Sequence, residues 1–144
     1  MCDYCDCRTR PLLARLGEDH GRILALVGTI ERLAATGAGV ADAHEPLAEL
    51  ADLLVPHSAA EEVGFYVELA LAGIDTEGLS ADHGHVDGTV RDAARGDVDA
   101  WAVMPQALMA LRDHIHREEY DLFPAAHQLL SSEAWDRIDA ATPR

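Results

Sequence analysis

Apolar residues recur every three or four positions along most of the chain, which is the period of an amphipathic α-helix. Four long segments follow this pattern, over residues 11–37, 44–73, 80–96 and 98–130. Short breaks that contain glycine separate them, and no stretch alternates β-branched and polar residues as a half-buried strand does. The pattern therefore predicts an all-α protein.

Individual residues indicate where these helices begin and bend. Pro11 suits the first turn of a helix, and Ser80 is a good N-cap for the third segment. Pro56 and Pro124 lie inside the second and fourth segments. Because proline removes a backbone hydrogen bond, we expect a kink or local widening just before His57 and a kink at the far end of the fourth segment.

A shorter helix is predicted near the C-terminal end, over residues 131–141. Ser131 or Ser132 would cap it, and Trp135 and Ile138 would dock it against the other helices. Four long helices with short connections favour an up-down-up-down antiparallel four-helix bundle, in which this last helix is an addition.

Composition and charge fit a single soluble domain and narrow the range of partners. The chain has 144 residues, of which 49% are hydrophobic and 26% are charged. Its formal net charge of −15 would repel nucleic-acid phosphates and anionic membrane surfaces, so neither is expected as a partner. Residues 1–30 contain no hydrophobic signal region, and no stretch reaches the roughly 20 apolar residues of a membrane span, so we expect a cytoplasmic protein.

The three cysteines, Cys2, Cys5 and Cys7, lie close together at the start of the chain. We expect residues 1–9 to form a cysteine-rich leader and residues 10–144 to form the bundle domain. An odd number of cysteines cannot form a closed set of disulfides within one chain, which favours reduced thiols or a thiolate metal site. A redox relay, an intermolecular disulfide and a disordered tail with incidental thiols are the alternatives.

The second and fourth predicted helices contain the same motif. His57 and Glu61 match His114 and Glu118, within the similar segments HSAAEEVGFY and HIHREEYDLF. The HxxxE spacing puts the two side chains of each pair on one face of a helix, about one turn apart, so both can reach one metal ion.

The first and third predicted helices also repeat each other. The tripeptide Asp-His-Gly occurs once in each and contains His20 and His83. The resulting order of His, HxxxE, His, HxxxE suggests two duplicated helix pairs related by a pseudo-twofold axis. A single HxxxE is usually a solvated pair, but two in matched contexts, each with a matched histidine on a partner helix, favour a shared site.

These candidate ligands lie among apolar neighbours; Leu13 and Leu16, for example, flank His20. Imidazoles and carboxylates inside an aliphatic core are costly unless they are paired or bound to a cation. The remaining histidines lie on other faces of their helices and are expected near the surface: His44, His85, His116 and His127. The predicted metal ligands are His20, His57, Glu61, His83, His114 and Glu118.

The ligand types indicate which metal such a site would hold. Four imidazoles and two carboxylates suit a pair of first-row ions better than a closed structural zinc site. If Glu61 and Glu118 both bridge, each ion receives two imidazoles and two carboxylate oxygens, which leaves room for a solvent-derived bridge and an exchangeable position. Iron and manganese are both candidates for such a pair, which could bind dioxygen or peroxide and exchange electrons with it.

This set of residues resembles the hemerythrin family, and specifically the bacterial hemerythrin-like HHE cation-binding domains. The likeness covers residues 10–130, and some bacterial members carry a similar cysteine-rich leader. The resemblance implies a four-helix bundle with a non-haem diiron centre bridged by the two carboxylates, so we expect two iron ions with an oxo or hydroxo bridge, with manganese as the alternative. It also implies reversible interaction with dioxygen, peroxide or nitric oxide.

The chain departs from the oxygen-carrying hemerythrins at one position. Those proteins have a fifth histidine one turn after the third-helix histidine, where this chain has Asp87; Leu24 occupies the matching place on the first helix. Either Asp87 supplies an oxygen ligand or that ion has an additional open position, and both alternatives would change redox potential and ligand affinity. The carriers also separate the last histidine and its carboxylate by five residues, which makes Glu119 a second candidate beside Glu118.

Three functions are compatible with these observations. The first is an oxidoreductase that uses peroxide or dioxygen, with an unidentified electron donor and no catalytic residues beyond the metal ligands. The second is a sensor or storage module that binds dioxygen, nitric oxide or iron reversibly, without turnover. The third is an acidic helical adaptor for a basic partner, which would purify without stoichiometric metal.

Overall fold

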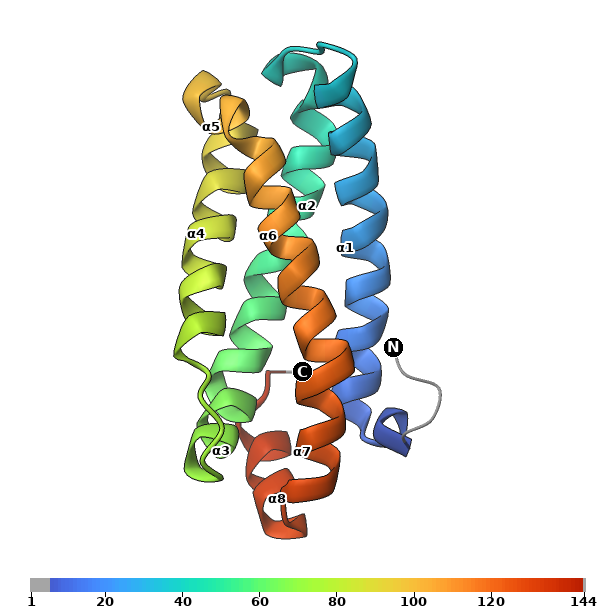
Figure 1. Ribbon diagram of the computed structural model, residues 1–144, viewed down its shortest axis with the longest axis vertical. Coiled ribbons are helices and arrows are strands. Elements are labelled where there is room, and N and C mark those ends of the chain that lie inside the picture. The colour runs from blue at the N-terminus through green and yellow to red at the C-terminus, as the bar shows by residue number, and fades with distance from the viewer. Residues whose placement is uncertain (1–5, 144) are drawn as a thin grey trace.

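The computed structural model describes residues 6–143 as a bundle of helices (Figure 1). Its long helices are α1 (Pro11–Ala35), α2 (His44–Ala60), α4 (Glu77–Ala94) and α6 (Met104–Arg117). Each packs against the next, and α6 packs back against α1, so the four close into a ring. No strand occurs within residues 6–143, which confirms the all-α prediction for this part of the chain.

Two of the long helices pass through a π-helical turn and then continue. After α2 the backbone widens over η3 (Glu61–Phe65) and continues as α3 (Tyr66–Leu71); after α6 it widens over η4 (Glu118–Leu122) and continues as α7 (Phe123–Leu129). We therefore count four bundle helices: α1 is the first, α2 to α3 the second, α4 the third, and α6 to α7 the fourth.

The π-helical turns correct the prediction made from Pro56. Helix α2 continues through Pro56 to Ala60, and the widening begins only at Glu61. In both turns the carbonyl of the first residue accepts from the N–H five residues later, so Glu61 accepts from Tyr66. Both turns start at a fully buried glutamate, and the second is followed by Pro124, in the first turn of α7, where a distortion was expected.

The third bundle helix begins earlier than predicted. Helix α4 starts at Glu77, and Ser80 lies inside the helix instead of capping it. The carboxylate of Asp75 accepts a hydrogen bond of 3.0 Å from the Glu77 N–H, which stabilises this earlier start.

The segment predicted as one helix from residue 98 is divided in two. A short α5 (Val98–Ala102) precedes a turn at Val103, and α6 follows with Pro105 in its first turn. Asp97 caps α5 by accepting from two backbone N–H groups. Since proline is tolerated in a first turn but not in a helix interior, the break lies where Pro105 requires it.

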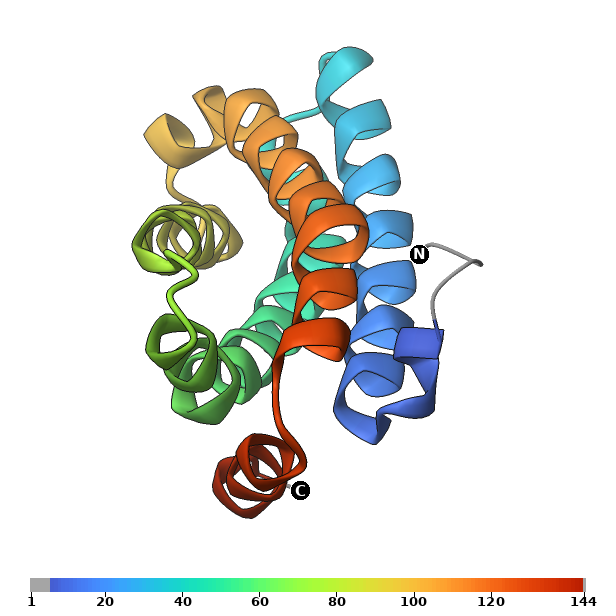
Figure 2. The ribbon, with the colours of Figure 1, turned by 60° about the horizontal axis from the view of Figure 1, so that its bottom comes forward.

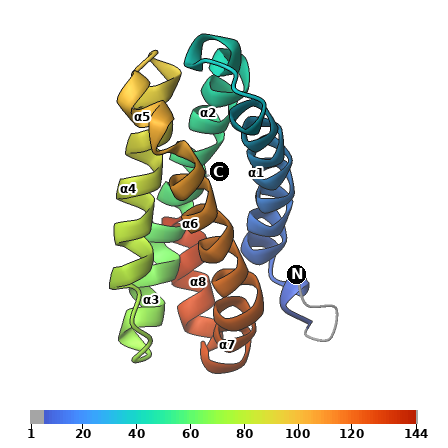
Figure 3. The ribbon, with the colours of Figure 1, turned by 45° about the horizontal axis from the view of Figure 1, so that its top comes forward.

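The predicted C-terminal helix is present as α8 (Ser132–Ala141). Ser131 caps it by accepting from the Ala134 N–H at 3.2 Å, as expected. Trp135 and Ile138 are buried, and the helix packs against η3 of the second bundle helix (Figures 2 and 3).

The predicted leader lies partly within the described residues. Its segment η1 (Asp6–Thr9) packs on α1, and Cys7 is fully buried and disulfide-bonded. The expectation of a reduced thiol is therefore wrong for Cys7. Cys2 and Cys5 lie outside the described residues.

Buried apolar side chains form two clusters, one toward each end of the bundle. On the first bundle helix, for example, Leu16 belongs to one cluster and Ile23 to the other, with His20 between them. In the part of the chain that the structure describes, no helix combines the length and apolarity that crossing a membrane requires.

Candidate metal centre

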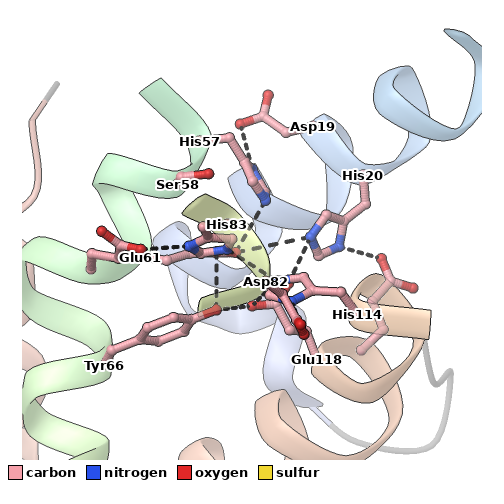
Figure 4. A network of polar contacts seen from close by, with 12 residues as sticks. Asp19, His20, His57, Ser58, Glu61, Tyr66, Asp82, His83, His114 and Glu118 are labelled. Carbon is pink, nitrogen blue, oxygen red and sulfur yellow. Dashed lines mark hydrogen bonds and ion pairs between the residues drawn. The ribbon is translucent and has the colours of Figure 1, made fainter. Parts of the chain in front are cut away.

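Six polar side chains meet between the two apolar clusters (Figure 4). Each bundle helix contributes one histidine, and the second and fourth also contribute the first residue of their π-helical turns. None of the six residues is more than 6% exposed. They are the six residues predicted from the sequence: His20, His57, Glu61, His83, His114 and Glu118.

The six side chains form two overlapping groups with the geometry of cation sites. Each group offers four ligand atoms that lie within 4.8 Å of one another. Glu61 and Glu118 belong to both groups. His20 and His57 complete the first group, and His83 and His114 complete the second.

Each shared glutamate faces one histidine of each group. The two oxygens of Glu61 lie 3.1 Å from His57 Nε2 and 3.0 Å from His83 Nε2. Those of Glu118 lie 3.1 Å from His20 Nε2 and 3.4 Å from His114 Nε2. Each carboxylate therefore spans the two groups, as a carboxylate that bridges two ions must.

Comparison with known proteins bears directly on this arrangement. The family model described as the hemerythrin HHE cation-binding domain matches residues 12–126, a range that contains all six side chains. The chain belongs to the hemerythrin HHE family. Searches of curated proteins and of solved structures found no match to this hemerythrin domain.

The π-helical turns bring two aromatic residues into the centre of the hemerythrin domain. The Tyr66 hydroxyl lies 2.5 Å from Glu118 Oε1 and 3.2 Å from Glu61 Oε2, and it donates to these carboxylates. Its ring stacks on His83, and the ring of Phe123, at the matching place on the fourth bundle helix, stacks on His20.

Tyr66 was not predicted from the sequence, because α-helical spacing points from Glu61 to Phe65, four residues later. The π-helical turn moves the next inward position to Tyr66. The aromatic residues at the matching ends of the two motifs, Tyr66 and Phe123, were the sequence signal that could have pointed to it.

A second set of carboxylates contacts the outer nitrogens of the four histidines. In each case the imidazole Nδ1 faces a carboxylate from the preceding bundle helix in the ring. The Nδ1 to oxygen distances are 3.5 Å for His57 and Asp19, 2.7 Å for His83 and Glu62, 3.4 Å for His114 and Asp82, and 2.9 Å for His20 and Glu119. These contacts direct every Nε2 toward the shared glutamates.

Glu119 therefore has a different place from the one considered in the sequence analysis. It belongs to neither cation group and instead contacts the outer side of His20. The sequence contained a signal for the four outer carboxylates. Asp19 and Asp82 directly precede the matching histidines, and Glu62 and Glu119 directly follow the matching glutamates.

The carboxylates change the protonation of the buried histidines. Burial lowers the pKa of His57, but Glu61 and Asp19 outweigh it and raise that pKa to about 10. The same balance, with Glu61 and Glu62, raises the pKa of His83 to about 9. Burial raises the pKa of Glu118, yet His114 and His20 bring it well below its ordinary value. A cation entering the centre must therefore displace protons from imidazoles.

Three buried atoms at the centre indicate that a cation fits there. His20 Nε2, Glu61 Oε1 and Glu118 Oε2 are inaccessible to solvent and form no hydrogen bond of good geometry within the described residues, although His20 Nε2 lies 3.1 Å from Glu118 Oε2 and Glu61 Oε1 lies 3.1 Å from His57 Nε2. Buried polar atoms are nearly always satisfied, and a bound cation would satisfy all three. Imidazole nitrogen and carboxylate oxygen are also the donors that first-row metal ions accept.

Asp87 and the other histidines lie outside the two groups. The Asp87 carboxylate is half-buried and accepts a hydrogen bond of 3.0 Å from Ser58, and burial raises its pKa. His44, His85 and His116 are exposed and His127 is half-buried, in keeping with the expected outer positions.

Proposed function

We propose that this hemerythrin domain is an up-down-up-down four-helix bundle that holds two iron ions and binds and redox-processes dioxygen or peroxide. The observation that carries the proposal is the pair of buried groups that share Glu61 and Glu118. Each group offers two imidazole nitrogens and two carboxylate oxygens, so the chain supplies a matched donor set for two ions. Bound iron would supply Lewis acidity and electrons for reaction with dioxygen or peroxide.

The residues around the ligands would hold this centre in place. The outer carboxylates orient the imidazoles and increase their basicity, as carboxylates behind metal-binding histidines generally do. Tyr66 fixes the two shared glutamates relative to each other through its hydroxyl. The two apolar clusters above and below the ligands keep bulk water from the reacting groups.

The alternative is a module that binds dioxygen, nitric oxide or iron reversibly, as a sensor or a store, without turnover. The burial of all six side chains favours small ligands in either case, because it leaves no room for an organic substrate beside the ligand atoms. An electron donor for turnover would have to act through the protein shell.

Metal analysis of the purified protein tests the proposal. We expect two iron ions per chain after expression in iron-supplemented cells, and an optical spectrum that changes on addition of peroxide. His57→Ala and Glu118→Ala should lose iron and the spectrum, whereas the control His85→Ala, an exposed histidine on α4, should retain both. Stoichiometric manganese in place of iron, absence of metal, or unchanged iron in both ligand variants would contradict it.

Peroxide consumption separates the two functions. An enzyme should consume peroxide faster than an equal amount of free iron, and this excess should vanish in His57→Ala. A rate no greater than that of free iron, together with reversible binding of dioxygen or nitric oxide, would favour the sensor or storage function.

A further inference from the structure

The two halves of the bundle match closely around the centre; besides Tyr66 and Phe123, they differ at a pair of neighbouring positions beside the histidines. His57 and His114 correspond to each other, as do His83 and His20, so Ser58 corresponds to Ile115 and Asp87 to Leu24. Ser58 and Asp87 form a polar contact of 3.0 Å between the second and third bundle helices. The corresponding residues between the fourth and first bundle helices are both apolar.

A small cavity adjoins this polar pair. It reaches His57, His83 and His114, and its wall also includes Ser58 and Asp87. Asp82 and four aliphatic side chains complete the wall. Its volume of about 10 Å³ is close to what one water molecule requires.

The cavity lies on the side of the second group. It contacts both histidines of that group, His83 and His114, but only His57 of the first. Asp87 lies one helical turn beyond His83, and it is directed toward Ser58 instead of toward the shared glutamates. The space beside the second group is therefore left to a ligand from solution.

We propose that a small ligand of two or three heavy atoms binds through this cavity at the second group, with Ser58 and Asp87 contacting its outer end. This inference rests on the proposed function, because it concerns the ion that His83 and His114 would hold. The cavity has room for about one water-sized group beyond the atom that would contact the ion, which limits the ligand to two or three heavy atoms. Its polar wall sets the chemistry: the Asp87 carboxylate can accept from hydrogen peroxide, and the Ser58 hydroxyl, which otherwise donates to Asp87, can donate to an anion or to dioxygen when it gives up that bond.

Azide, a linear anion of three atoms, is a suitable probe. We would titrate azide into the iron-loaded protein, follow the optical spectrum, and measure iron per chain in every variant. Asp87→Leu and Ser58→Ile each introduce the larger apolar residue found in the other half, which fills the cavity. Loss of the Asp87 charge by itself would favour an anion, so a raised Kd for azide in Asp87→Leu reports the loss of space. We expect each to raise the Kd for azide about tenfold or more while iron content is retained.

The matched control is Leu24→Ala, which opens space at the corresponding position of the first group. Its Kd for azide should equal that of the unaltered protein. An unchanged Kd in Asp87→Leu and Ser58→Ile, or a weakened one only in Leu24→Ala, would overturn the inference. If one of the two cavity variants loses iron, the Kd for azide of the other variant tests the inference. Loss of iron from both variants would also overturn it, since Ser58 and Asp87 would then serve to hold the metal and not to receive a ligand.

Failure of the inference is distinguishable from failure of the proposed function. An unaltered protein without stoichiometric iron would refute the proposed function itself. An unaltered protein that holds two irons but does not bind azide would leave the iron site standing and refute only the ligand position.

Discussion

Each inward-facing imidazole of the centre also has a carboxylate on its outer nitrogen. Asp19 belongs to the first bundle helix, yet it contacts His57 on the second. Such a contact fixes which imidazole nitrogen carries the proton and which is free to face a cation. At the scale of residues, the orientation of the candidate ligands therefore depends on side chains that would not themselves touch the metal.

Removing one outer carboxylate should weaken metal binding without removing a ligand. We expect Asp19→Asn to lower iron affinity about 10- to 100-fold, because His57 loses both its orientation and part of its basicity. Competition with a chelator of known affinity measures this change. Asp113→Asn, the same change at an exposed position of α6, should leave the affinity as it is. Equal affinities in the two variants would show that the outer carboxylate has no such role.

At the scale of elements, the π-helical turn of the second bundle helix is covered by α8. The two approach closely at Gly64: a Cβ there would lie 3.1 Å from Ala141 Cβ and 3.3 Å from Ile138 Cα. A residue without a side chain is what permits this contact. The C-terminal helix thus packs directly against the turn that begins with Glu61.

Substitution of Gly64 should separate these two elements. We expect Gly64→Val to destabilise the fold by about 1–3 kcal/mol through overpacking against α8. The control Gly28→Val makes the same change inside α1, where the Cβ would meet only the end of the Arg32 side chain, at 3.5 Å, and an Arg112 nitrogen at 3.9 Å. Urea unfolding of both variants compares the free energies. An equal loss in both would mean that α8 contributes nothing to the penalty at Gly64.

At the scale of the whole molecule, a set of charged groups lies between two apolar clusters. Without a cation, protonated imidazoles balance the shared glutamates, which is why the pKa of His57 rises from 6.5 to about 10 and that of His83 to about 9. A bound cation would take over this role. Protons and metal are therefore expected to stabilise the fold over different ranges of pH.

The pH dependence of stability tests this exchange. Because the folded-state pKa values of His57 and His83 are raised, their stabilisation is fully present below pH 6.5 and is lost as the pH rises through about 9 and about 10. The Tm of protein stripped of metal should therefore fall between pH 7 and alkaline pH, whereas the iron-loaded protein should show little of this fall. A parallel decrease in both forms would contradict the exchange of protons for metal.

Spacing along the chain was enough to predict the helical class, most helix ends and the six candidate ligands, since these follow from single helices, where local geometry relates positions three or four residues apart. It could not place the π-helical turns, and so it missed Tyr66. It also could not pair His20 with Glu119, which lies 99 positions away, or direct Asp87 toward Ser58. Those contacts depend on how four helices pack together, because distances between helices are set by the side chains that fill the whole interior and not by any local repeat.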